Sequence, residues 1–210
     1  MARHPESPFV AERIPFHPLV YFPISATYRI RAALERRATP EEAYLRTNRD
    51  GQSVMRYVGD LTFRLGARPL RLRVFHAGEG VGTSVFVPFR DLTSGRETYG
   101  PGRYLTLELS EEDEYELDFN RAFNPYCAYT DAFECGFPPS ENDLPVRIPA
   151  GEKVWAADRN PRTPNALLLE RAGVRRPAAR PAPRARVARS SSRPRVRPKQ
   201  GATRSRRRSR

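Results

Sequence analysis

The chain of 210 residues contains few of the residues that build metal and redox sites: it has two cysteines and three histidines. A structural zinc site usually takes roughly four ligands, with cysteines separated by about two to four residues. Cys127 and Cys135 are eight positions apart, so we predict no metal site. We expect buried, reduced thiols. A loop-closing disulfide, a metal-ligand role and a nucleophile paired with His76 stay open as alternatives.

Long apolar runs are also absent. No uninterrupted apolar stretch reaches the roughly 18 residues that a membrane-spanning helix needs. The N-terminal residues lack the apolar core and the small-residue cleavage pattern of a secretory signal. We therefore expect a cytoplasmic protein that does not contact the membrane, in a compartment that keeps thiols reduced.

Lysine is rare too, since only Lys153 and Lys199 accompany the arginines, and we interpret this as genome-wide codon preference. Of the 37 basic residues, sixteen lie within residues 171–210, where no acidic residue occurs. This leaves 21 basic against 24 acidic residues in positions 1–170, a balance of about −3. The net charge of +13 therefore comes from the C-terminal tail, and the body is mildly acidic.

The tail has too little apolar surface to offset the entropy of ordering, so residues 174–210 are predicted to be disordered. Its arginines can neutralise phosphates, which predicts nonspecific, salt-dependent binding of DNA or RNA. The cluster nearest the C-terminus comprises Arg204, Arg206, Arg207 and Arg208. The tail has no aromatic residue for base stacking. A solvated extension that reflects codon preference is the alternative.

The body shows the two-residue apolar alternation that is typical of half-buried β-strands. Strand-like runs lie at residues 28–34, 54–58, 61–65, 70–75, 84–89, 104–109 and 115–119. Asn48–Gly51 predicts a hairpin turn. Thr39–Glu42 predicts a turn or one helical turn, because a capping residue precedes a proline. Short strands at roughly ten-residue spacing predict a mainly β fold with an antiparallel sheet, either a barrel-like roll or a two-layer sandwich.

Composition divides the chain into four predicted parts. These are an extended N-terminal arm over residues 1–23, a mainly-β domain over 24–158, a linker with a short helix over 159–173, and the disordered tail over 174–210. The short helix is predicted because Thr163 can cap it, Pro164 suits its first position and Gly173 follows its end.

The segment Leu117–Lys153 resembles neither a plain strand nor a linker. It contains both cysteines, several aromatic residues and a Pro-Pro-Ser-Glu-Asn turn. A stretch of this composition forms a structured loop that its own side chains hold in place, and such loops carry function more often than the scaffold does. We therefore expect the functional site in this segment.

Two segments, Val85–Leu105 and Leu117–Lys153, resemble the signature blocks of the domain of unknown function 1684 family, a widespread prokaryotic group. The resemblance covers roughly residues 20–155 and implies no established activity. By this resemblance the family's motif positions are Phe89–Asp91, Thr98-Tyr99, Gly102–Tyr104, Asp118–Asn120, Asn124-Pro125, Cys127, Cys135, Pro138-Pro139, Glu141-Asn142 and Gly151–Lys153. This chain has Gly136-Phe137 where the family pattern implies Pro-Leu, which changes the local turn and not the polar residues.

The polar residues of these blocks predict a cleft. An arginine binds a carboxylate or phosphate through two parallel hydrogen bonds, and a carboxylate can serve as a general base. The predicted ligand-binding residues are Arg90, Asp91, Tyr99, Arg103, Asn120, Asn124, Glu141 and Asn142. The catalytic candidates are Asp118 and Glu141. A network of turn caps and salt bridges is the alternative interpretation.

The function that these observations favour is binding of a small anionic molecule in a polar cleft near the 117–153 segment. A nucleic-acid-associated protein that acts through its basic tail is a second hypothesis. A hydrolase-type enzyme that uses Asp118 or Glu141 as general base is a third. The sequence identifies no cofactor, substrate or oligomeric state.

Overall fold

The computed structural model of the protein describes residues 7–11, 18–77, 84–108 and 112–155. The strands are β1 (Arg29–Arg46), β2 (Gln52–Leu65), β3 (Arg68–Ala77), β4 (Ser84–Phe89), β5 (Arg103–Glu108) and β6 (Glu114–Asp118). The helices are α1 (Pro8–Ala11) and the 3₁₀ turns η1 (Ala26–Tyr28), η2 (Phe119–Arg121), η3 (Tyr126–Ala128) and η4 (Ser140–Asn142). None of the described helices is long or apolar enough to cross a membrane.

The six strands form one antiparallel, barrel-like and nearly closed sheet in the order β5-β4-β3-β2-β1-β6. The long β1 and β2 form a hairpin whose turn contains Asp50 at a positive φ of 59°, in agreement with the turn predicted at Asn48–Gly51. The prediction of a mainly β fold with an antiparallel sheet is therefore confirmed, and of the two predicted forms the structure shows the barrel-like roll and not the two-layer sandwich.

A bend interrupts the long strands. The pairing of β1 with β2 shifts between Arg36 and Glu41, and the pairing of β2 with β3 shifts between Tyr57 and Gly59. At the bend β1 approaches β2 so closely that a Cβ on Gly59 would lie 2.3 Å from the carbonyl oxygen of Glu35. The predicted helical turn at Thr39–Glu42 is wrong, because these residues continue β1 through the bend.

The core lies on the inner face of the sheet. Its side chains alternate with more exposed ones along parts of the strands, as the two-residue period requires, whereas β3 and β4 bury consecutive residues near their ends. Buried members from the strands include Ala32, Leu34, Leu61, Phe63, Leu72, Val74, Val85, Val87, Phe89, Leu105, Tyr115 and Leu117.

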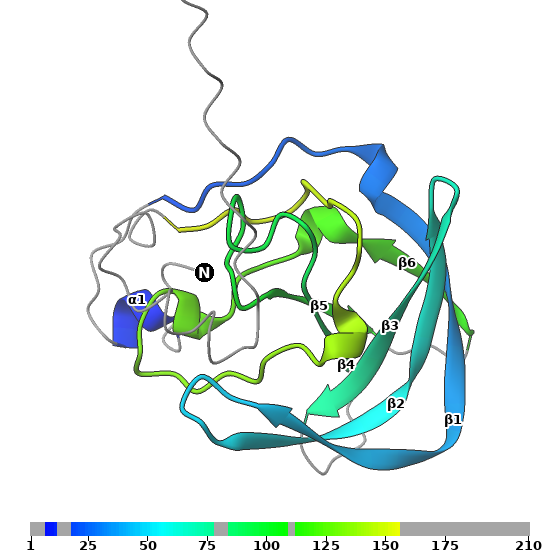
Figure 1. The fold of residues 1–210 in the computed structure, drawn as a ribbon, viewed down its shortest axis with the longest axis horizontal. Helices are drawn as coiled ribbons and strands as arrows, with labels where there is room; N and C mark the ends of the chain where they lie inside the picture. The colour runs from blue at the N-terminus through cyan, green and yellow to red at the C-terminus, as the bar shows by residue number, and fades with distance from the viewer. Residues whose placement is uncertain (1–6, 12–17, 78–83, 109–111, 156–210) are drawn as a thin grey trace, which may run out of the picture. The chain divides into compact units, whose positions relative to one another are not determined.

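The segment after β6 completes this core. Residues 119–155 contain no strand and three 3₁₀ turns, yet they contribute Phe119, Ala122, Leu144, Ile148 and Ala150 to the main apolar cluster. In Figure 1 this segment, drawn from green to yellow, runs beside the sheet and not away from it. The sequence predicted a structured loop here, and the structure shows an irregular segment whose apolar side chains form part of the core.

The N-terminal residues that are described contact the same segment. Phe9 of α1 packs with Tyr129 and Trp155, with ring centroids 5.1 and 5.8 Å away. Part of the predicted extended arm is thus a four-residue helix. The predicted helix after Thr163, and the tail with Arg204, Arg206, Arg207 and Arg208, lie outside the described residues.

Candidate functional site

A buried arginine joins the sheet to the 119–155 segment. The side chain of Arg103, in β5, is fully buried and donates to the carbonyl oxygens of Ile148 (3.1 Å), Ala150 and Glu152 (3.4 Å). It also pairs with the equally buried Asp91, with 3.3 Å between Nη2 and Oδ1. Burial lowers the pKa of the Arg103 guanidinium and the Asp91 carboxylate opposes that shift. Protein acceptors therefore occupy both terminal nitrogens of this predicted ligand-binding arginine, and its Nε is buried without a partner.

Asp91 is held as tightly as its partner. Its Oδ2 accepts from the backbone N–H of Ile148 at 2.6 Å, and its Oδ1 accepts from the Thr93 hydroxyl at 2.8 Å. The Thr93 hydroxyl also bonds to that of Thr98 at 2.9 Å. The predicted pair Asp91 and Arg103 is thus brought together, and both partners hold the 91–98 turn and the irregular 148–152 stretch in place.

A second buried network centres on Glu152. Its carboxylate accepts from the backbone N–H of Asn124 at 2.9 Å and from the Tyr129 hydroxyl at 2.5 Å. The Asn124 amide donates to the carbonyl of Lys153 at 2.9 Å. Burial raises the pKa of Glu152, although these donors and the charge of Arg103 oppose the shift. Burial also raises the pKa of Tyr129.

Sequence reasoning did not select Glu152 as a site residue. The sequence offers one indication of its importance, which is its place in the Gly151–Lys153 motif implied by the family resemblance. An isolated carboxylate in an irregular segment belongs to no periodic pattern, so periodicity cannot reveal it. Tyr21 forms an isolated bridge with Glu152, and Glu152 is 1% exposed. The carboxylate is therefore covered by the protein itself.

Arg90 and Asn142 connect η4 to the sheet. Arg90 binds Asp143 through Nε and Nη2, at 2.5 and 3.0 Å. The Asn142 side chain accepts from the N–H of Arg73 (2.8 Å) and donates to the carbonyls of Arg73 (3.0 Å) and Pro88 (2.6 Å). Among the described residues, the pairing of β3 with β4 has one matched position, Phe75 with Phe86. The Asn142 side chain therefore provides hydrogen bonds to backbone groups that a longer β3–β4 pairing would otherwise satisfy.

Three other predicted residues also have protein partners. Asp118 caps η2 by accepting from the N–H of Asn120 at 3.0 Å, and Asn120 binds both backbone groups of Ser25. The buried Tyr99 hydroxyl lies 3.5 Å from the carbonyl of Cys127. These contacts fix chain segments, and they leave Glu141 as the exposed member of the predicted set.

Glu141 lines a polar cleft at the bend of the sheet, which we call the bend cleft. Its volume is about 570 Å³. The lining residues are Arg37, Glu41, Glu42, Ala43, Tyr44, Leu45, Tyr57, Asp60, Arg71, Arg73, Phe75, Pro139 and Glu141. Strand register explains part of this set, because Glu41, Tyr57 and Phe75 occupy one row across β1, β2 and β3.

Charged groups in the bend cleft are arranged around Tyr57. The guanidinium carbons of Arg37 and Arg73 lie 5.4 and 5.2 Å from the centre of its ring, within reach of a cation–π contact. Arg73 pairs with Glu141 at 3.1 Å, and Arg71 pairs with Asp60 at 3.3 Å. The Glu141 pKa is lowered, chiefly by the N–H of its own backbone, with a smaller contribution from Arg73.

Two atoms of the cleft-lining residues are buried without a hydrogen-bond partner. They are Nε of Arg73 and Oδ1 of Asp60. Buried polar atoms of native proteins are generally paired with protein, water or a ligand. The wall therefore contains one buried donor and one buried acceptor whose hydrogen-bonding capacity the described protein does not fill.

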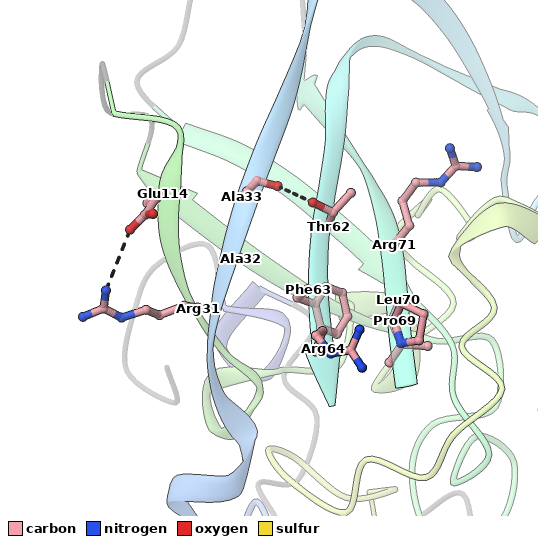
Figure 2. A pocket seen from close by; sticks show the side chains of 10 residues that line it. All are labelled: Arg31, Ala32, Ala33, Thr62, Phe63, Arg64, Pro69, Leu70, Arg71 and Glu114. Carbon is pink, nitrogen blue, oxygen red and sulfur yellow. Dashed lines mark hydrogen bonds and ion pairs between the residues drawn. The ribbon is translucent and has the colours of Figure 1, made fainter. Parts of the chain in front are cut away.

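A second hollow, the sheet groove, lies over β6, β1, β2 and β3, and Figure 2 shows its lining. Its volume is about 700 Å³. At its centre the hydroxyl of Thr62, in β2, donates to the carbonyl of Ala33, in β1, at 3.4 Å. At one side Arg31 pairs with Glu114 at 3.8 Å. The sheet groove contains no residue of the 117–153 segment, in which the site was predicted.

The two cysteines are free thiols, with Cys127 buried and Cys135 half-buried. Within residues 7–11, 18–77, 84–108 and 112–155, no group of three or more His, Cys, Asp or Glu side chains is placed to hold a metal ion. His76 instead lies 3.0 Å from the carbonyl of Ser84 through Nδ1.

Comparison with known proteins identifies relatives of unknown activity. No curated protein matches the chain. A solution NMR structure of an uncharacterised protein from Haloarcula marismortui is 37% identical and superposes with a TM-score of 0.57. The match covers 70% of this chain and 88% of the archaeal one. Residues 15–153 match the family described as "Protein of unknown function (DUF1684)", and the chain therefore belongs to that family.

Proposed function

We propose that this protein is a small-molecule-binding domain whose bend cleft takes a small molecule with a carboxylate or phosphate group. The anionic group binds Arg73 in place of Glu141, and Tyr57 and Asp60 contact the rest of the molecule. The proposal keeps Glu141 from the sequence prediction, adds Arg73, and assigns Arg90, Asp91, Arg103, Asn124 and Asn142 to the support of the fold.

The observation that carries this proposal is the state of Arg73. Its Nε is buried without a partner, and its Nη1 pairs with a carboxylate that is 39% exposed. An ion pair of that exposure contributes only about 0–1 kcal/mol, so a ligand anion can displace Glu141 at little cost. Once Glu141 is displaced, the Nη1–Nη2 edge of the planar guanidinium donates two parallel hydrogen bonds to the anion, which binds it in bidentate fashion.

The geometry supports binding better than hydrolysis. A general base works best when its pKa is near the working pH, and the Glu141 pKa is lowered instead. The other candidate, Asp118, already accepts bonds from the backbone and the side chain of Asn120, at 3.0 and 2.7 Å. The Ser140 hydroxyl donates to Oε2 of Glu141 at 3.2 Å, but the lowered pKa makes this carboxylate a weak base for activating it.

The first test is native mass spectrometry of the full chain purified without chelator, followed by thermal unfolding with inorganic phosphate, citrate and a nucleoside monophosphate. A ligand at a hundredfold excess over its Kd stabilises the folded state by about 2.7 kcal/mol. Arg73→Gln should abolish that stabilisation. Glu141→Gln should strengthen binding, because the competing carboxylate is removed.

Arg31→Gln is the matched control, since it is the same change on an exposed arginine of the sheet groove. It should leave the stabilisation unchanged. Equal stabilisation of wild type and Arg73→Gln would refute the assignment to the bend cleft. Loss in Arg31→Gln alone would move the site to the sheet groove of Figure 2.

A second candidate function rests on the sixteen basic residues of positions 171–210. Binding of nucleic acid through Arg204, Arg206, Arg207 and Arg208 predicts an affinity for duplex DNA that falls steeply with salt. Truncation after Gly173 should remove this affinity without changing ligand binding by the domain. Affinity that survives the truncation would refute a role for the tail.

A further inference from the structure

The two cysteines of the chain meet in the structure. Cys127 lies in η3 and forms a small buried cluster with Tyr99 and Ala128, against which Cys135 packs. The two side chains are hydrogen-bonded to each other. The intervening residues fold back so that two thiols eight positions apart become neighbours.

The backbone holds both thiols in this arrangement. Cys135 donates its N–H to Oδ1 of Asn48 at 2.7 Å and accepts from the N–H of Asn48 at 3.3 Å. The next residue but one, Phe137, donates to the carbonyl of Arg46 at the end of β1. Cys127 sits in a turn closed by the bond from Ala128 to Pro125. Each sulfur therefore belongs to a separately anchored segment.

The two thiols have different surroundings. Cys127 is 5% exposed, whereas Cys135 is half-buried and closer to solvent. The thiol of Cys127 and the N–H groups of Cys127 and Tyr126 donate to the sulfur of Cys135 and lower its pKa, with the smallest contribution from the nearby Tyr104 hydroxyl, although burial opposes the shift. The bond to Cys135, together with burial, raises the pKa of Cys127. Cys135 is thus the more accessible sulfur and the one whose surroundings favour the thiolate.

We propose that Cys127 and Cys135 form a redox-active dithiol that exchanges with small-molecule disulfides, with Cys135 as the attacking sulfur and Cys127 as the resolving sulfur. The Cys135 thiolate attacks one sulfur of the small disulfide, a mixed disulfide forms, and one thiolate leaves. Cys127 then loses its proton and attacks the Cys135 sulfur, and the second thiolate leaves. The protein gives up two electrons and two protons, and the small disulfide is reduced to two thiols.

The test uses the full chain in buffers of reduced and oxidised glutathione. Free thiols are then blocked with a maleimide under denaturing conditions and counted by intact mass. The count of free thiols should fall from two to zero in one step, and the oxidised protein should be a monomer without attached glutathione. Cys127→Ser should accumulate a glutathione adduct on residue 135. Cys135→Ser should react more slowly than Cys127→Ser, because its remaining thiol, Cys127, is the more deeply buried of the two.

Two outcomes would overturn the proposal. One is that the native protein keeps both thiols free in oxidised glutathione, whereas the urea-unfolded chain forms the disulfide between Cys127 and Cys135. The other is oxidation that yields only disulfide-linked dimers. If the serine variants do not fold, alkylation of the wild type by iodoacetamide with peptide mapping decides the order of attack. Modification of Cys135 first, with a midpoint below pH 9.0, supports the assignment, and modification of Cys127 first refutes it. These readouts do not depend on the bend cleft.

Discussion

Arg103 and Asp91 form an ion pair in which both side chains are completely buried, with 3.3 Å between Nη2 and Oδ1. An isolated buried charge is strongly unfavourable, so a pair of this kind persists where further hydrogen bonds satisfy both groups. Here three carbonyls accept from the two terminal nitrogens of the guanidinium, whose Nε is buried without a partner, and a backbone N–H and a hydroxyl satisfy the carboxylate. The pair therefore acts as a structural link between β5 and the 148–152 stretch.

Asp91→Asn should destabilise the domain by about 3–5 kcal/mol, because it leaves the Arg103 cation buried without its counter-ion. Urea denaturation of the two proteins measures the difference. Glu114→Gln, which breaks an exposed pair with Arg31, serves as control and should change stability by less than about 1 kcal/mol. Similar losses in the two variants would show that the buried pair contributes little.

Asn142→Ala should cost about 2–4 kcal/mol, since it leaves buried backbone groups of Arg73 and Pro88 without partners. Hydrogen exchange at β3 and β4 should quicken more than exchange at β1 and β6. Ser140→Ala, an exposed change in the same 3₁₀ turn, should be nearly neutral. Uniform loss of protection across the sheet would argue against a local link between β3 and β4.

The Glu152 carboxyl should make stability depend on pH. Its folded-state pKa is raised above 4.5, so the folded domain binds this proton more tightly than the unfolded chain does. The contribution of Glu152 to stability is therefore largest below about pH 4.5 and declines as pH rises through the folded-state pKa. Glu152→Gln removes this dependence, so the stability of the variant relative to wild type should improve across that window. A pH-independent difference would contradict the raised pKa.

Gly59→Ala should destabilise the bend by about 1–3 kcal/mol, because the new methyl would lie 2.3 Å from the carbonyl oxygen of Glu35 and the two strands would have to separate. Thermal unfolding measures this loss. Gly136→Ala is the matched comparison and should cost less, since its nearest contact would be 3.3 Å to Cβ of Leu45. If the two variants lose the same stability, β1 and β2 can separate at the bend to accept the methyl group without strain.

The strands could be predicted from the sequence because their apolar period is local. Leu61 and Phe63 alternate with polar neighbours, and the hairpin turn before β2 has its own turn residues. The bend could not be predicted in this way. Thr39-Pro40 carries a helix-start pattern, yet pairing with β2 keeps the chain extended there, so tertiary contacts override local preference.

The candidate site was harder to predict because polar residues look the same in a ligand site and in a buried network. Arg90 and Arg103 were chosen for their chemistry, and their partners Asp143 and Ile148 lie 53 and 45 positions away. No local pattern reveals such distant pairs. Arg73 was missed for the opposite reason, since it alternates with apolar residues as any solvent-facing strand residue does.

The place of β1 between β2 and β6 has a consequence for synthesis on the ribosome. β1 ends at Arg46, whereas β6 ends at Asp118. At roughly 5–20 residues per second, one edge of β1 waits roughly 4–14 s for its partner. The earliest strand to be made is thus the one exposed longest to wrong partners, and slow translation of the middle of the chain should promote aggregation through β1.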